Sequence, residues 1–329
     1  MKLKRPVVSL LAIGAVASLG LTGCAGGTSA GGGSSADAKD IKLTFIQGVA
    51  GDPFYVTMQC GVDAEAKKLG VTVNTQGPAK FDPTLQKPIV DSVVATKPGA
   101  ILIAPTDTAA MQAPLKAATS AGVKVVLVDT TVKDPSFATS QISSDNVGGG
   151  EAAFKAIKSL APSGGKVLVI STDPGVSTAD QRVEGFETAA KADSDFSYLG
   201  VQYSHNDPAT AAKLTTAALA KDSDIVGVFA ANTFAAQGVA TGIRQAGKED
   251  SVKVVGFDAG ADAVTQLKNG TVQALIAQQP ALIGKDAVQQ AVAAIKGEKV
   301  TAKIPTGFFA ITKDNLEGEG ANYVYKTTC

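Results

Sequence analysis

Short apolar runs alternate with longer amphipathic stretches along the chain from residue 41 onward. The runs are rich in Val, Ile and Leu and are mostly bounded by Gly, Pro or Asp, which is typical of strands buried on both faces of a sheet. We expect nine strands of this kind, at residues 41–46, 71–75, 100–104, 123–128, 166–170, 198–203, 225–230, 252–257 and 272–277.

The amphipathic stretches between these runs have the ends that helices require. Three of them stop at a glycine, which can adopt the left-handed conformation that terminates a helix. These are residues 54–69 before Gly70, residues 108–121 before Gly122 and residues 232–246 before Gly247.

This alternation predicts parallel sheets built by right-handed crossovers. It starts again at Lys166, after Ser163-Gly164-Gly165, and nine strands exceed one comfortable sheet. We therefore predict an α/β fold of two doubly wound parallel-sheet lobes. Ligands of such sheets bind beyond the carboxyl ends of the strands, so two facing lobes would form a cleft there.

The residues that follow the predicted strands are mostly carboxylates, amides and aromatic rings. Carboxylates accept hydrogen bonds from adjacent hydroxyls, amides both donate and accept, and aromatic faces cover the C–H surface of a sugar. This inventory is suited to a neutral, hydroxyl-rich ligand. The segments are 52–55, 105–107 and 129–131 in the first half, and 180–182, 206–207, 232, 257–258 and 278–279 in the second.

Several of these residues have a structural alternative, because Asp and Asn after a strand often cap the next helix. We favour capping for Thr106-Asp107 and for Asp207-Pro208. Three consecutive glycines, Gly148-Gly149-Gly150, could indicate a phosphate-binding loop. They have neither the dinucleotide-binding spacing nor the Lys-Ser/Thr of a nucleotide-binding loop, and we interpret them as a linker into a helix.

Catalytic and metal-binding patterns are missing from the sequence. There is no Ser/His/Asp set and no Cys/His pair, and the single histidine, His205, has no obvious partner. No cluster has metal-ligand spacing. We expect a protein that is not an enzyme and that uses no metal and no cofactor.

Charge argues against a nucleic-acid partner. Lys and Arg together number 30, as do Asp and Glu, whereas nucleic-acid binders usually carry a basic excess. A hydrophobic share of 45% is ample for a buried core.

The first residues have the pattern of an export signal. Lys2, Lys4 and Arg5 precede an apolar stretch at 7–21 that is too short to span a membrane. The following Leu-Thr-Gly-Cys, ending at Cys24, resembles the bacterial lipoprotein signal, in which the cysteine is acylated and the chain is cut before it. We expect a signal at 1–23, a Gly/Ser-rich tether at 24–40 and a lipid anchor on the outer face of the cell membrane. An ordinary secretory signal is the alternative.

Two later cysteines, Cys60 and Cys329, are compatible with either a disulfide or two free thiols. An exported protein meets an oxidising environment, which allows the disulfide.

The ordered strand-end segments resemble the ribose-binding-protein group of type I periplasmic binding proteins, the substrate-capture components of ABC sugar importers. The resemblance covers residues 41–312. It lies in DPFY (52–55), IAPTD (103–107), VD (128–129), SDNV (144–147), RVEGF (182–186), FAAN (229–232), VGFD (255–258) and IAQQP (276–280).

The resemblance implies a monomeric solute-binding protein with an ABC permease as partner and a hinge crossed near 144–145, 278–279 and 307–308. The lobes would be 41–144 with 279–307, and 145–278 with 308–329. It implies sugar contacts from Asp52, Phe54, Tyr55, Asp129, Asn232, Phe257, Asp258 and Gln278, with Phe54, Tyr55 and Phe257 around the carbon skeleton. The candidate ligand-binding set also includes Thr130, Asp180, Arg182 and Asn206.

Departures from the ribose-type pattern bear on the ligand. Thr130 and Asp180 stand where that pattern has arginines, and Ala104 where it has an asparagine. An arginine only donates hydrogen bonds and so serves a ring oxygen, which a linear polyol lacks. We therefore expect a sugar alcohol of four to six carbons, such as xylitol or threitol, ahead of an aldopentose or aldohexose of the ribose or galactose type. Arg182 could instead restore ring recognition.

Three other functions fit parts of the sequence. Sugar-responsive repressors share the fold but need a helix-turn-helix before the first strand, where this chain has a signal and tether. An exported glycosidase would use two of the carboxylates. A sensor that feeds a membrane receptor would have the same binding chemistry as an importer component.

Overall fold

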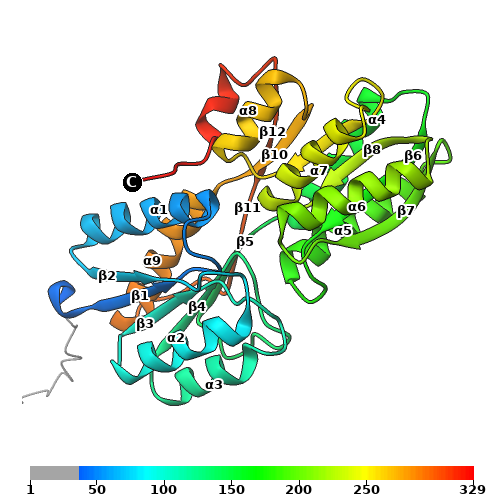
Figure 1. Cartoon of the computed structure of the whole chain (residues 1–329). Helices are drawn as coiled ribbons and strands as arrows, with labels where there is room; N and C mark the ends of the chain where they lie inside the picture. The colour runs from blue at the N-terminus through cyan, green and yellow to red at the C-terminus, as the bar shows by residue number, and fades with distance from the viewer. Residues whose placement is uncertain (1–36) are drawn as a thin grey trace, which may run out of the picture. The chain divides into compact units, whose positions relative to one another are not determined.

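The computed structural model describes residues 37–329, and within them it confirms the α/β fold with two mainly parallel sheets (Figure 1). The expected signal at 1–23, Cys24 and the tether up to residue 36 lie outside the described residues. The described part opens with a short 3-10 helix, η1 (Ala38–Asp40). No helix between residues 37 and 329 combines the length and the apolarity that crossing a bilayer demands.

The first sheet has six strands in the order β11-β5-β4-β3-β1-β2, all parallel. Figure 1 shows α1 and α9 on one face of this sheet and α2 and α3 on the other. Its elements are β1 (Lys42–Ile46), α1 (Pro53–Leu69), β2 (Thr72–Gln76), α2 (Pro83–Ala95), β3 (Ala100–Ile103), α3 (Gln112–Ser120), β4 (Lys124–Val128), β5 (Ser140–Ser144), α9 (Pro280–Lys296) and β11 (Lys303–Thr306).

The second sheet repeats this order as β12-β10-β9-β8-β6-β7, with β12 antiparallel to β10. Its elements are α4 (Asn146–Leu160), β6 (Gly165–Ser171), α5 (Ser177–Lys191), β7 (Phe196–Tyr203), α6 (Pro208–Lys221), β8 (Ile225–Ala230), α7 (Thr233–Gln245), β9 (Lys253–Phe257), α8 (Ala261–Asn269), β10 (Ala274–Gln278) and β12 (Phe308–Thr312). Fully buried Phe186 and Phe229 stack in its core with ring centroids 5.2 Å apart.

The nine predicted strands are confirmed, and the structure adds β5, β11 and β12. β12 has a short apolar run, Phe308–Ile311, that the prediction left out, whereas β5 and β11 lack such a run. β5 reads Ser-Gln-Ile-Ser-Ser, and β11 contains Pro305 at an edge of its sheet, where a missing N–H is tolerated.

The predicted helix ends are largely confirmed. Gly70, Gly122 and Gly247 all have positive φ, between 62° and 89°. The helix expected at 108–121 begins only at Gln112, because Asp107 accepts hydrogen bonds from the backbone of Ala109 and Ala110 and holds a turn there.

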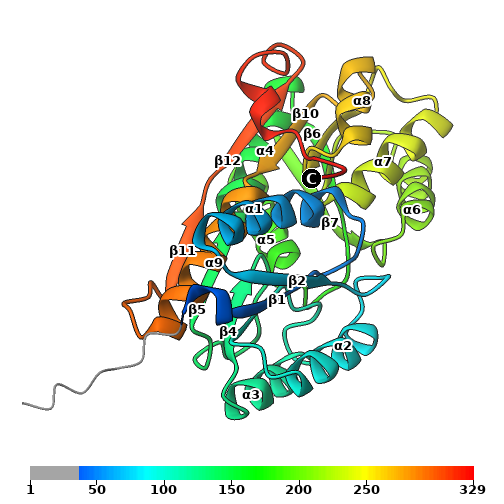
Figure 2. The same ribbon diagram turned by 90° about the vertical axis from the view of Figure 1, so that its left-hand side faces the viewer.

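The chain passes between the sheets three times. Sheet membership changes after β5, after β10 and between β11 and β12, and Figure 2 shows β11 running almost straight into β12. The lobe limits drawn from the sequence stay a prediction, and these changes of sheet are compatible with them.

Glycines allow two helices of the second sheet to touch through their backbones. A Cβ on Gly150 in α4 would lie 2.1 Å from the carbonyl oxygen of Arg182, and one on Gly185 in α5 would lie 2.0 Å from that of Val147. The interpretation of 148–150 as a linker is therefore wrong: these glycines lie in the first turns of α4, where the close approach excludes side chains.

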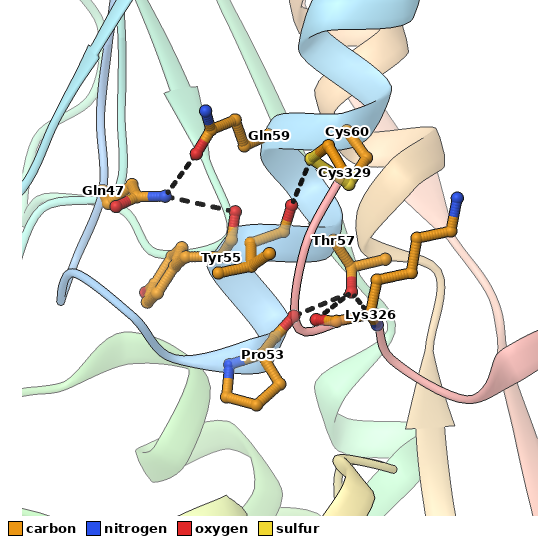
Figure 3. The surroundings of a disulfide bond; sticks show 9 residues. Gln47, Pro53, Tyr55, Thr57, Gln59, Cys60, Lys326 and Cys329 are labelled. Carbon is orange, nitrogen blue, oxygen red and sulfur yellow. Dashed lines mark hydrogen bonds between the residues drawn. A yellow bond between two sulfur atoms is a disulfide. The ribbon is translucent and has the colours of Figure 1, made fainter.

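The C-terminal tail, residues 313–329, leaves the second sheet and ends on α1 of the first. It contains the 3-10 helix η2 (Glu319–Tyr323). Its last residue, Cys329, forms a disulfide with Cys60 in α1, with the two Cα atoms 5.2 Å apart (Figure 3). Of the two alternatives left open by the sequence, the structure has the disulfide.

Replacing Gly185 with Ala tests the contact between α4 and α5. Alanine favours an isolated helix by about 1 kcal/mol relative to glycine. The clash with the Val147 carbonyl should nevertheless lower the free energy of unfolding by about 1–3 kcal/mol, measured by urea titration. The control is Glu184→Ala, at the neighbouring exposed position, with an expected change within about 0.5 kcal/mol. A Gly185→Ala variant as stable as the wild type would contradict the contact.

Candidate functional site

A cavity lies where the carboxyl ends of the two sheets meet. It contains about 440 Å³ of empty space, part of it open to solvent. Eight of the twelve candidate ligand-binding residues line it. They are Asp52, Phe54, Tyr55, Asp129, Arg182, Asn232, Asp258 and Gln278.

Two carboxylates occupy equivalent positions in the two sheets. Asp129 directly follows β4 and Asp258 directly follows β9, and each donates its backbone N–H to the neighbouring strand. Both have left-handed backbones, with φ of 60° and 79°. Residues other than glycine are strained in this region, and such strain concentrates at functional sites.

Each of the three cavity carboxylates has one oxygen engaged by the protein. Asp52 Oδ1 accepts from the Phe54 N–H at 2.8 Å, because Asp52 is the N-cap of α1. Asp129 Oδ2 accepts from the Tyr55 hydroxyl at 2.8 Å. Asp258 Oδ1 accepts from Gln278 Nε2 at 2.7 Å. For each carboxylate, no donor from residues 37–329 engages the second oxygen, so it is available to a ligand hydroxyl.

Burial shifts the proton equilibria of these groups. It raises the pKa of Asp52 to about 7, helped by the nearby charge of Asp258, and it raises the pKa of Asp129 to about 6. Burial also raises the pKa of the Tyr55 phenol well above its usual range, so this hydroxyl stays protonated and donates.

Arg182 is the cation of the cavity. It comes from α5 and is 4% exposed. Its Nε donates to Asn146 Oδ1 and its Nη1 to the Ala231 carbonyl, both at 2.9 Å. No carboxylate of the described chain lies within ion-pair distance of it. Since a guanidinium has five N–H donors, some remain for a ligand.

Gln278 connects the cavity to the hinge. It ends β10, at one of the three passages between the sheets, and its Oε1 accepts from the Ser144 hydroxyl at 2.7 Å. Ser144 ends β5 and also lies 3.3 Å from the hydroxyl of Thr306, which ends β11. The three passages therefore begin at residues that hydrogen-bond to one another.

The rims of the cavity also meet. The Thr131 N–H donates to the Ser177 hydroxyl at 2.9 Å, and the Thr108 N–H donates to the Gly175 carbonyl at 3.1 Å. These bonds join loops of the first sheet to the α5 region of the second. The cavity is consequently enclosed on this side.

Four candidate residues do not line the cavity. The Thr130 hydroxyl donates to the Pro105 carbonyl, and Asp180 turns to accept from the Gly175 N–H. Asn206 does not reach the cavity and instead accepts a hydrogen bond from the side chain of Asn232, which lines the cavity and caps α7. Phe257, expected against the ligand, is fully buried beneath the Arg182 guanidinium, whose carbon is 3.8 Å from the ring centroid.

Five cavity residues were absent from the sequence prediction. Phe81 and Thr172 carried a usable signal, since each lies after a predicted strand. The buried Thr172 hydroxyl has no partner in the described chain, which is costly unless a ligand or water supplies one. The others are Val176, Thr178 and Ala179, small residues at the start of α5 with no distinguishing chemistry.

The remaining polar predictions have structural roles. Asp207 caps α6 by accepting from the Thr210 N–H, as favoured from the sequence. His205, expected to lack a partner, lies against Asp173 at an exposed position. Between residues 37 and 329 there is no group of three His, Cys, Asp or Glu that could hold a metal ion.

The arrangement can bind a neutral molecule that offers several hydroxyls. Three carboxylate oxygens accept, a guanidinium and a threonine donate, and the rings of Phe54, Tyr55 and Phe81 supply apolar walls.

The sequence matches the model of the periplasmic binding protein domain over residues 43–299. Among curated proteins, it is 33% identical over 282 residues to the ribose import binding protein RbsB of Escherichia coli, covering 85% of this chain and 93% of the relative. It is 32% identical over 270 residues to RbsB of Bacillus subtilis, covering 82% and 87% of the two chains.

Solved structures give the same picture. A solute-binding protein of an ABC transporter from Agrobacterium vitis, bound with α-D-tagatopyranose, has 40% identity and a TM-score of 0.85, covering 87% of this chain and 99% of its own. A second from the same organism, with bound D-fucose, has 32% identity and a TM-score of 0.82, covering 87% and 100%.

Replacing Asp52 with Asn tests the raised pKa. The folded chain keeps the Asp52 proton up to a pH of about 7, whereas the unfolded chain loses it near the ordinary pKa of 3.8. The resulting stabilisation is complete below pH 3.8 and is lost as the pH rises to about 7. Asp129 contributes a stabilisation of the same sign, which is lost as the pH rises through its pKa of about 6. Without ligand, the free energy of unfolding of the wild type should fall by about 2 kcal/mol from pH 5.5 to 8.

The fall should be smaller in Asp52→Asn, since asparagine still caps α1 but does not titrate. Asp82→Asn is the matched control. Asp82 caps α2 from a half-buried position, and its hydrogen bonds lower its pKa, so it is ionised throughout this range. Denaturant titrations at several pH values measure the slopes, and identical slopes in wild type and Asp52→Asn would contradict the assignment.

Proposed function

Because the chain belongs to the periplasmic binding protein family, we propose that it is the binding component of a sugar ABC importer and holds one monosaccharide in its ring form between the two lobes. Membership in this family implies a location outside the cytoplasm. The relatives are import binding proteins, not enzymes, and their names and structures mention ribose, allose, tagatopyranose, fucose and arabinose.

The observation that carries the proposal is the placement of unpaired hydrogen-bonding capacity around one enclosed space. Asp52, Asp129 and Asp258 each keep an open oxygen, and Arg182 keeps open donors without an ion pair. A molecule with several hydroxyls and one acceptor atom satisfies all of them. Hydrogen bonds to charged groups contribute about 1.5–3 kcal/mol each, enough for micromolar binding after desolvation and lost freedom.

Arg182 favours a ring sugar over a sugar alcohol. The expectation of a linear polyol was based on the absence of arginines at positions 130 and 180 and of an asparagine at position 104. Neither Thr130 nor Asp180 lines the cavity, whereas Arg182 lines it and supplies a guanidinium. A guanidinium only donates, and a pyranose or furanose offers a ring oxygen that only accepts. We therefore place the ring sugar first and xylitol-like or threitol-like ligands second.

Calorimetric titration decides between the two ligand classes. The panel comprises D-tagatose, D-fucose, D-arabinose, D-ribose and D-allose against xylitol and threitol. At least one ring sugar should bind with a Kd at or below the micromolar range, and the polyols should bind at least about tenfold more weakly. Binding of a polyol alone would establish the sugar-alcohol hypothesis, and binding of no member would refute the proposed function.

The same titration with Arg182→Gln tests the donor. Loss of a hydrogen bond from a charged group should weaken binding of the preferred ring sugar by about 10- to 100-fold. Arg244→Gln is the control, because Arg244 is exposed on α7. Thermal unfolding of both variants separates a lost contact from a lost fold. An unchanged Kd in folded Arg182→Gln would remove the argument for ring recognition.

We also propose that Cys24 carries a lipid that holds the chain on the outer face of the cell membrane. Its support is the signal-like pattern that precedes Cys24. Native protein should partition with membranes and give a mass that begins at Cys24 with added acyl groups, and Cys24→Ser should abolish both. Native protein without acyl mass would contradict this anchor.

A further inference from the structure

The C-terminal tail contributes a buried tyrosine to the underside of the cavity. Tyr325 is 4% exposed, and its backbone N–H donates to the Ala259 carbonyl beside Asp258. Its ring centroid lies 5.9 Å from that of Phe54, a wall residue. The family match ends at residue 299, so this residue belongs to a segment beyond it.

The Tyr325 hydroxyl makes hydrogen bonds with two cavity residues. It donates to Asp258 Oδ1 at 2.9 Å and accepts from the Gln278 N–H at 2.9 Å. Burial raises the pKa of this phenol well above its usual range, which keeps the donating proton in place. Because Gln278 Nε2 also donates to Asp258 Oδ1, that oxygen has two protein donors.

This double engagement determines which carboxylate oxygen a ligand meets. With Oδ1 engaged twice, Oδ2 is the oxygen of Asp258 that stays available. The carboxylate follows a strained backbone, with φ of 79°, so its orientation depends on the groups that hold it.

The end of the tail is attached to the helix that supplies the opposite wall. The Lys326 N–H donates to the Thr57 hydroxyl at 2.7 Å, and that hydroxyl donates to the Pro53 carbonyl at 2.7 Å (Figure 3). The Cys60–Cys329 disulfide lies further along α1. Helix α1 begins at the Asp52 cap and carries Phe54 and Tyr55.

We propose that Tyr325 is a positioning residue of the binding site, which aims Asp258 and Gln278 at the ligand, and that the Cys60–Cys329 disulfide keeps it there. This inference rests on the proposed function for the identity of the ligand. It assigns a role in specificity to a segment outside the family match.

Calorimetry on Tyr325→Phe tests the role of the hydroxyl, since phenylalanine retains the ring. The probes are the tightest-binding sugar of the panel and its monodeoxy analogues. The parent sugar should bind about tenfold more weakly to Tyr325→Phe. One analogue lacks the hydroxyl that donates to Asp258. For this analogue Tyr325→Phe should cause no loss of affinity, because the missing hydroxyl and the substitution remove the same interaction.

Tyr323→Phe is the matched control. Tyr323 lies in the same tail and stacks on Phe309, with ring centroids 4.6 Å apart. The Tyr323→Phe variant should bind every sugar with the affinity of the wild type. A general loosening of the structure would weaken all analogues equally. An equal penalty for all of them, or no penalty for any, would overturn the positioning role.

Hydrogen exchange of the Gln278 backbone amide supplies a test that needs no ligand. Loss of its acceptor in Tyr325→Phe should raise the exchange rate at least about tenfold, with no change in Tyr323→Phe. Unchanged exchange would overturn the inference. If the wild type binds no sugar of the panel, the proposed function fails, and this measurement still decides whether Tyr325 holds Gln278.

Variants of the disulfide test its part of the inference. Cys329→Ser and Cys60→Ser should each weaken binding of the parent sugar to the level of Tyr325→Phe. Combining Cys329→Ser with Tyr325→Phe should add no further loss, because both act through the same contact. Additive losses, or wild-type affinity in folded Cys329→Ser, would show that the disulfide does not act through Tyr325.

Discussion

The side chain of Gln278 joins the hinge to the binding site, and the geometry of the cavity depends on it. Its carbonyl accepts from Ser144 of the first sheet, and its amide donates to Asp258 of the second. Ser144 in turn lies against Thr306, so all three passages of the chain begin within this group. Because Gln278 is bonded to both sheets, a change in the angle between them would strain these hydrogen bonds. These hydrogen bonds connect the passages between the two sheets to a carboxylate of the cavity.

The charges around the cavity argue against an anionic ligand. Three carboxylates share the space with the Arg182 guanidinium, whose hydrogen bonds go to Asn146 and the Ala231 carbonyl and not to these carboxylates. Buried charges without partners cost several kcal/mol each in desolvation, and the raised pKa values of Asp52 and Asp129 reflect this cost. An anionic ligand would increase the repulsion. Hydroxyl groups lower the energy by donating to the carboxylates without adding charge.

Local sequence patterns were sufficient for the fold and for part of the site. Apolar runs located nine strands, and the rule that ligands bind at strand ends identified Asp52, Asp129 and Asp258. The same rule failed for Phe257, since it does not tell which side chain of a strand end faces the cleft. It also assigned weight to Thr130 and Asp180, whose side chains turn to nearby backbone groups. The contribution of Tyr325 depends on contacts with residues 47 and 67 positions away in the sequence, and no local pattern reports such contacts.

The disulfide gives this exported chain a maturation step. Thiols are kept reduced in the cytoplasm and oxidise outside it, so the bond between Cys60 and Cys329 can form only after translocation. Cys60 and Cys329 are 269 residues apart in the sequence, so this whole span must have crossed the membrane before the bond closes. Full affinity for sugar would then be acquired last, in the compartment where the sugar is found.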